Sequence, residues 1–99
     1  MMFAKNPPIR NKEWLAAVHE IECCVRCGKY GIEAAHRDWG KGAGQKTSDH
    51  LTAALCKACH HELGNGNKLP RDERRSEMDR CIVLTFDQLV QRGLIGTTP

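Results

Sequence analysis

Two Cys-x-x-Cys pairs decide the fold: Cys24-Val-Arg-Cys27 and, after 28 intervening residues, Cys56-Lys-Ala-Cys59. Each pair places two thiolates on one tight turn, and two such turns supply the four sulfurs of a tetrahedral zinc site. Gly28 is expected to let the first turn pass beneath the metal without a Cβ clash. Because four protein ligands fill the coordination sphere of zinc, the sequence predicts a structural Zn²⁺ that leaves no position for water.

The chain has two further cysteines and one alternative use for its sulfur atoms. Cys23 is an alternative ligand to Cys24, although Cys24 gives the x-x spacing. Cys81 is expected to be a small buried hydrophobic residue on a helix. A disulfide framework is the alternative to zinc, but reduced thiols in the cytosol more often bind metal.

Length and composition favour one small cytoplasmic domain. A chain of 99 residues allows a single domain over 1–99 with a thin core, which often needs a metal or disulfides. No apolar run is long enough for a signal peptide or a membrane span, so no membrane partner is expected. The 15 Lys and Arg exceed the 12 Asp and Glu by a net charge of +3, which does not by itself identify a nucleic-acid binder. Most of this excess lies between Cys24 and Lys46, where the motifs lie.

Apolar periodicity and capping residues predict helices around a pair of short strands. An irregular lead-in over 1–10 precedes a helix over 12–21 with Asn11 as its N-cap. Strands are expected over 30–36 and 51–55, with a glycine-rich loop over 37–48 between them. A helix opening at Cys56 should stop at Gly64-Asn-Gly66, which completes a core over 22–66.

Two accessory helices are expected within 71–93, after Pro70. The first covers 71–81, with Met78 and Cys81 on a thin apolar side. The second covers 85–92, with Thr85 as its N-cap and with Leu89 and Val90 directed inward. Gly93 should end this helix.

The order of residues around the second cysteine pair resembles that of the HNH (ββα-metal) endonucleases. The shared features are a histidine after Ala34-Ala35, a glycine-rich basic loop, an Asp-His pair, and Cys-x-x-Cys-His at a helix start. The histidine is His36, the acidic residue Asp49 lies seven residues before Cys56, and His60 follows Cys59. Within that superfamily the chain is most similar to small phage and prophage nucleases of the YbcO and Ref type, strongly over about 22–65.

The resemblance implies an α+β treble-clef ββα-metal fold, zinc-stapled and with flanking helices, that cleaves DNA in phage or prophage recombination or DNA processing. Phosphodiester hydrolysis needs an activated water and neutralisation of the developing charge. His36 would be the general base, and His60 would hold a divalent cation, Mg²⁺ or Mn²⁺. Asp49 would orient His36 by accepting its second ring N–H, or would add a ligand.

The basic loop is the expected contact with the DNA backbone. Arg37, Lys41 and Lys46 would bind phosphates, helped by the amides of the three loop glycines. The alternative is a flexible, solvated loop without a ligand.

Two departures from the HNH pattern weaken the cation site. Ala35 stands where many HNH enzymes carry a ligating Asp or His, and Gly64 stands where many carry another. His50, His61 and Asn65 are possible substitutes, although His61 is expected to face solvent. A zinc-stapled DNA-binding module without catalysis and a zinc-stapled protein-interaction module are therefore the alternative functions.

Overall fold

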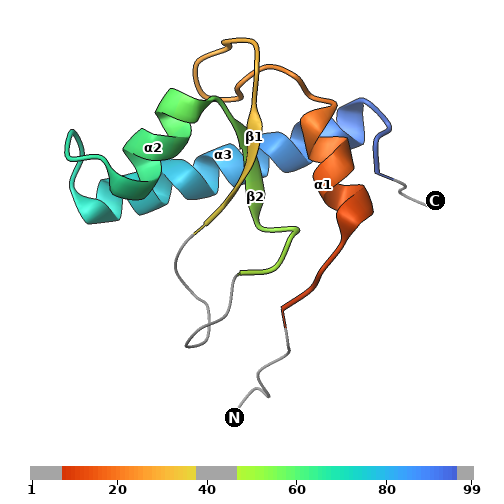
Figure 1. Cartoon of the computed structure of the whole chain (residues 1–99), viewed down its shortest axis with the longest axis horizontal. Helices are drawn as coiled ribbons and strands as arrows, with labels where there is room; N and C mark the ends of the chain where they lie inside the picture. Colours follow the sequence, from red (N-terminus) through yellow and green to blue (C-terminus); the bar gives the residue numbers. More distant parts are fainter. Residues whose placement is uncertain (1–7, 38–46, 96–99) are drawn as a thin grey trace.

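The computed structural model describes residues 8–37 and 47–95 of the chain. The elements are α1 (Lys12–His19), β1 (Glu33–His36), β2 (Thr52–Leu55), α2 (Lys57–Asn65) and α3 (Arg71–Gln91). The two strands form an antiparallel hairpin, α3 crosses behind it, and α1 and α2 lie on either side (Figure 1). The protein is thus a small α+β domain with a four-cysteine cluster between hairpin and helix, consistent with the predicted ββα zinc-stapled fold. None of the described helices is both long and apolar enough to cross a membrane.

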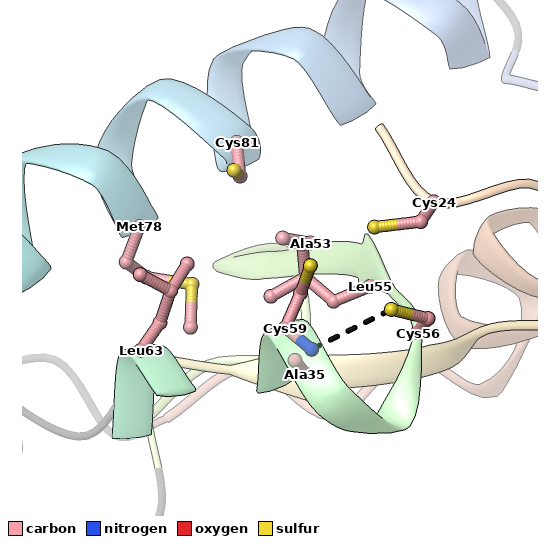
Figure 2. Close-up of a cluster of buried hydrophobic side chains, with 9 residues drawn as sticks. All are labelled: Cys24, Ala35, Ala53, Leu55, Cys56, Cys59, Leu63, Met78 and Cys81. Carbon is pink, nitrogen blue, oxygen red and sulfur yellow. Dashed lines mark hydrogen bonds between the residues drawn. The ribbon is translucent and has the colours of Figure 1, made fainter. Parts of the chain in front are cut away.

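Successive side chains of the hairpin point to opposite faces, so the domain has two small apolar clusters, one on each face. Ala35 pairs with Ala53 and Ala34 with Ala54, so neighbouring residues point to opposite faces. Ala35 and Ala53 pack with Leu63 of α2 and with α3 on what we call the α2 face (Figure 2). Ala54 packs against α1 and the C-terminal half of α3 on the opposite, α1 face. The small alanine side chains allow helices to approach both faces closely.

The predicted caps position α1 and α2. The side chain of Asn11 accepts a hydrogen bond from the backbone N–H of Trp14 at 3.1 Å, as expected of an N-cap. α1 ends at His19, two residues earlier than predicted, although Ile21 is still buried beyond its end. α2 begins after Cys56 and ends at Asn65, within the predicted Gly-Asn-Gly stop.

One continuous helix, α3, replaces the two accessory helices predicted after Pro70. The prediction of Thr85 as an N-cap was wrong: its hydroxyl donates to the carbonyl of Cys81 at 2.8 Å, one turn earlier in the same helix. The same hydroxyl accepts a hydrogen bond from the backbone N–H of Ala54 at 3.0 Å. This N–H lies on the edge of β2 that pairs with no other strand in the described part of the chain, so Thr85 satisfies a buried donor from inside the helix.

The end of α3 was predicted correctly, but one of its inward residues was not. Gly93 has a φ of +67°, and the N–H groups of Gly93 and Leu94 donate to the carbonyls of Val90 and Leu89. These two hydrogen bonds form a Schellman motif, which favours glycine at that position. Leu89 is fully buried, whereas Val90 is 37 % exposed because it lies on the outer side of the helix.

Candidate metal centre and histidine pairs

The four cysteines of the two Cys-x-x-Cys pairs meet in space. The Sγ atoms of Cys24, Cys27, Cys56 and Cys59 all lie within 4.8 Å of one another. The Sγ atoms of Cys27 and Cys56 are 3.7 Å apart, close to the roughly 3.8 Å edge of a tetrahedron with Zn–S bonds of about 2.3 Å. Figure 2 shows three of these side chains directed toward the same region. The donor set and its geometry therefore fit a structural Zn²⁺.

Backbone hydrogen bonds shape both turns that carry the ligands. In the first turn, Gly28 N–H donates to the carbonyl of Cys24, and Cys24 N–H donates to that of Lys29, each at 2.8 Å. Gly28 has a φ of +82°, which favours glycine, but no atom lies within 4 Å of an added Cβ. Glycine is thus favoured there by its φ, and the predicted Cβ clash was wrong. In the second turn, Cys56 Sγ accepts from the backbone N–H of Cys59 at 3.5 Å and so also caps α2 (Figure 2).

The ionisation of the thiols is uneven across the cluster. Burial alone would raise the pKa of Cys24, but hydrogen bonds from the backbone N–H groups of Cys56, Cys27 and Arg26 outweigh it and lower the pKa to about 7. The pKa of Cys59 is raised to about 12, chiefly by burial; the hydrogen bond from Arg26 lowers it, and the neighbouring thiols raise it. Crowded thiolates repel one another, so a bound cation would favour the fully deprotonated set.

Arg26, between the two ligands of the first pair, ties the cluster to both following helices. Its guanidinium donates to Glu62 of α2 at 3.0 Å and to Glu77 of α3 at 3.1 Å. The same group lies 3.6 Å from Cys59 Sγ, within reach of an N–H···S contact. Arg26 therefore supports the ligand turn from outside the coordination sphere.

The other two cysteines lie outside the four-cysteine cluster. Cys24 and not Cys23 belongs to the group of four clustered sulfurs, which resolves the choice of ligand in favour of Cys24. Cys81 is fully buried between α3 and the hairpin, and burial raises the pKa of its thiol to about 11. All six cysteines are free thiols, so the alternative of a disulfide framework finds no support.

The structure brings His36 and Asp49 into contact at the end of the hairpin where the connecting loop joins β1 to β2. His36 Nε2 lies 2.8 Å from Asp49 Oδ1, and the side chain of His36 is 28 % exposed. Asp49 is buried and also accepts from the backbone N–H of Asn11 at 2.7 Å and from Arg10 at 3.2 Å. Burial alone would raise the pKa of Asp49, but these three donors outweigh it and hold the pKa below its usual value. A charged Asp49 accepts, so Nε2 of His36 carries the proton and Nδ1 is left as the acceptor.

His60 meets a carboxylate that sequence reasoning missed. Its Nδ1 lies 2.9 Å from Oε1 of Glu33, at the start of β1. Glu33 lies two residues before Ala35, so the two share one face of the strand. The sequence signal that could have identified Glu33 was this two-residue spacing. Ala35 stands where many HNH enzymes carry a ligand, and a carboxylate two residues away on the same face can take its place.

The two histidines approach the hairpin from different sides. Glu33 and Ala35 belong to the α2 face with His60, whereas His36 belongs by alternation to the α1 face with its partner Asp49. Ala35 is fully buried and Gly64 has no side chain, so neither contributes a ligand. Among the described residues, the four cysteines are the one group of three or more Cys, His, Asp or Glu placed to hold a metal.

The remaining candidate residues are mostly exposed or lie outside the described ranges. Arg37 is half-buried and its guanidinium lies 3.7 Å from Asp79 of α3. Lys41 and Lys46, predicted to contact phosphates, lie outside the described residues. His61 is exposed, as expected, and the exposed ring of His50 packs edge-to-face against Trp14.

Comparison of the chain with protein-family models, curated proteins and solved structures finds no match in any of the three. The four-cysteine cluster accordingly suggests a zinc-binding small α+β domain, with no family assigned.

Proposed function

We propose that this zinc-binding domain is a divalent-metal-dependent DNA endonuclease of the HNH (ββα-metal) type. The observation that carries the proposal is the contact between His36 and Asp49. A partly exposed imidazole held by a buried, ionised carboxylate is the arrangement expected of a general base.

His36 supplies the base in this proposal. Asp49 fixes the proton on Nε2 and orients the ring, which leaves Nδ1 to accept a proton from a water molecule. The adjacent Arg10 and Asn11 hold Asp49 in place and keep it charged. Asp49 is therefore a positioning residue in this proposal and not a metal ligand.

His60 and Glu33 would be the protein ligands of the catalytic cation. One imidazole and one carboxylate make a sparse site, although Mg²⁺ usually keeps several waters and takes few protein ligands. Bound there, Mg²⁺ or Mn²⁺ would stabilise charge on the phosphate. His36 lies on the α1 face at the loop end of the hairpin, whereas Glu33, beside His60, lies on the α2 face at the other end, so a DNA strand would have to span the length of the hairpin.

A zinc-stapled DNA-binding module without catalysis is the second candidate. Two residues favour this candidate: Ala35 is fully buried and Gly64 has no side chain, so neither provides a ligand for a catalytic cation. This alternative predicts DNA binding without cleavage.

Nicking of supercoiled plasmid by the zinc-loaded chain, over a series of Mg²⁺ and Mn²⁺ concentrations, tests the proposal. Cleavage is expected from the wild type, and His36→Ala should lose about 10²- to 10⁴-fold in rate, the usual contribution of a general base. His60→Ala and Glu33→Gln should each raise the cation concentration that half-maximal cleavage requires.

His19→Ala is the matched control, since His19 is exposed on α1 and has no role in the proposal. It should nick at the wild-type rate. Wild-type protein that binds duplex DNA in a gel shift but never nicks it would favour the second candidate. Nicking by His36→Ala at the wild-type rate would refute the assignment of the base.

A further inference from the structure

Three arginines line a pocket where α2 ends and α3 begins. The pocket has a volume of about 100 Å³ and is lined by Leu63, Gly64, Arg71, Arg74 and Arg75. Room for one water takes about 10–15 Å³ on this measure, so the pocket can hold a small anion with its waters. The neighbouring acids of α3, Asp72 and Glu73, do not line it.

The helical period explains why positive charge gathers there. One face of α3 carries three arginines at the spacing i, i+3 and i+4, namely Arg71, Arg74 and Arg75. Asp72 and Glu73 lie on other faces of the helix. The N-cap of this 21-residue helix is Pro70, which makes no side-chain capping hydrogen bond. The positive end of the helix dipole therefore adds to the three guanidinium charges.

Arg74 is already fixed at the pocket. Its Nη1 donates to the carbonyl of Gly64 at 3.2 Å, and its Nε is buried without a hydrogen-bond partner in the described part of the chain. A buried donor left unpaired is costly, so Arg74 would gain from a shift of its side chain that brings an acceptor to its Nε. Nothing lies within 4 Å of a Cβ added at Gly64, so the wall formed by α2 is open.

We propose that this arginine pocket binds a phosphate of the DNA backbone, next to the phosphate that is cleaved. Arginine is the residue best suited to phosphate because its planar fork donates two parallel hydrogen bonds. Gly64 follows His60 by four residues on one helix face, an axial rise of about 6 Å. Phosphates of one strand follow every 3.4 Å along the duplex axis. With α2 lying along the DNA strand, the pocket would therefore suit a phosphate one or two nucleotides from the phosphate at His60. The choice of DNA as ligand rests on the proposed function.

Duplex binding by the zinc-loaded chain, measured by fluorescence anisotropy from 50 to 200 mM KCl, tests the pocket. Arg71→Gln/Arg75→Gln should flatten the plot of log affinity against log salt by about 0.9, the loss of one phosphate contact. Wild-type affinity should therefore fall about 3- to 4-fold more than that of the variant over this range. Gly64→Leu, which fills the open wall without changing charge, should flatten the plot equally.

Lys12→Gln/Lys29→Gln is the control, because it removes the same net charge from exposed positions away from the pocket. It should keep the wild-type slope, and all variants should keep wild-type zinc content and circular dichroism. An unchanged slope in the arginine pair, or equal flattening in the control, would overturn the proposal.

Titration with inorganic phosphate, followed by NMR of the backbone amides, separates DNA from free phosphate as the ligand. Amide shifts confined to Gly64 and the three arginines are expected, and Gly64→Leu should abolish them. Such shifts with an unchanged DNA slope would mean a site for free phosphate only, which overturns the assignment to DNA. DNA binding without nicking would refute the nuclease and leave the pocket standing. If the wild type nicks DNA and the pocket variants keep the wild-type salt dependence, the nuclease stands and the pocket is refuted. A wild type that binds no DNA would refute both the nuclease and the pocket.

Discussion

Asp49→Asn should destabilise the domain by about 2 kcal/mol while preserving the shape of the side chain. Asp49 Oδ2 accepts from the backbone N–H of Asn11, and Oδ1 accepts from His36 and Arg10. An amide has one oxygen, so whichever way it turns, at least one donor meets an N–H group. A donor left unpaired costs about 1–3 kcal/mol when buried, and this one is only partly buried. Loss of the charge weakens the remaining hydrogen bonds by about 1 kcal/mol, of which half-exposed Arg10 contributes little.

The assay is thermal and urea denaturation of zinc-loaded wild type and Asp49→Asn between pH 7 and pH 5. A domain of this size loses about 4–8 °C in Tm per kcal/mol, so Tm should fall by roughly 8–16 °C. Because the pKa of folded Asp49 lies below its usual value, its stabilisation is fully present above the unfolded pKa of about 4. The difference between the proteins should therefore not shrink from pH 7 to pH 5, and should shrink only as pH falls further.

Asp87→Asn is the matched control, since Asp87 is exposed on α3 and should change stability by less than about 0.5 kcal/mol. Equal stability of Asp49→Asn and wild type would refute the role of this carboxylate as an anchor. A difference that shrinks between pH 7 and pH 5 would refute its ionisation. In the plasmid assay Asp49→Asn should also lower the nicking rate, because His36 loses the acceptor that fixes its proton.

Three further predictions concern the metal centre and the contact of α3 with β2. Purified protein should contain about one zinc per chain by elemental analysis, and Cys59→Ser or chelation should unfold it, whereas Cys23→Ser should keep both zinc and melting temperature. Arg26→Gln should speed the transfer of zinc to a chelator, because Cys59 Sγ loses its N–H contact; an unchanged rate would show that Arg26 serves only Glu62 and Glu77. Thr85→Val should cost about 1–3 kcal/mol by leaving the buried N–H of Ala54 unpaired, and Thr85→Ser, which keeps the hydroxyl, should cost less; the reverse order in urea denaturation would contradict this reasoning.

Local chemistry was sufficient to predict the cysteine cluster and most element ends. Cys-x-x-Cys spacing fixes two sulfurs on a turn whatever the rest of the chain does, and the cap at Asn11 and the stop at Gly93 depend only on neighbouring residues. The prediction for Thr85 was wrong because the neighbouring residues do not distinguish a threonine that caps a helix from a threonine inside one. The donor that holds Thr85 inside α3 belongs to Ala54, 31 residues earlier in the chain.

The parts of the candidate site that escaped prediction depend on which face a residue occupies. Glu33 and Ala35 share one face of β1, but only the packing of α2 against that face brings His60 to Glu33. The spacing of Arg71, Arg74 and Arg75 is visible in the sequence, but a charged face on a helix is usually solvated. Only the packing of α2 against α3 shows that this face closes a pocket with Gly64.

The two halves of the proposed site are held by separate anchors. Cys56 directly follows the second strand, lies in the four-cysteine cluster and caps α2, so the position of His60 depends on the metal. The arginine pocket depends on it too, because Gly64 lies at the other end of the same helix. His36 is instead fixed through Asp49 to the segment that leads into α1, which contributes no sulfur to the cluster. Loss of zinc would therefore remove the cation ligand and the phosphate pocket, and the base with them because the domain unfolds, although zinc takes no part in the proposed chemistry. A change at Asp49 would disturb the base and leave the pocket in place, so the anchor at Asp49 can be tested without disturbing the zinc centre.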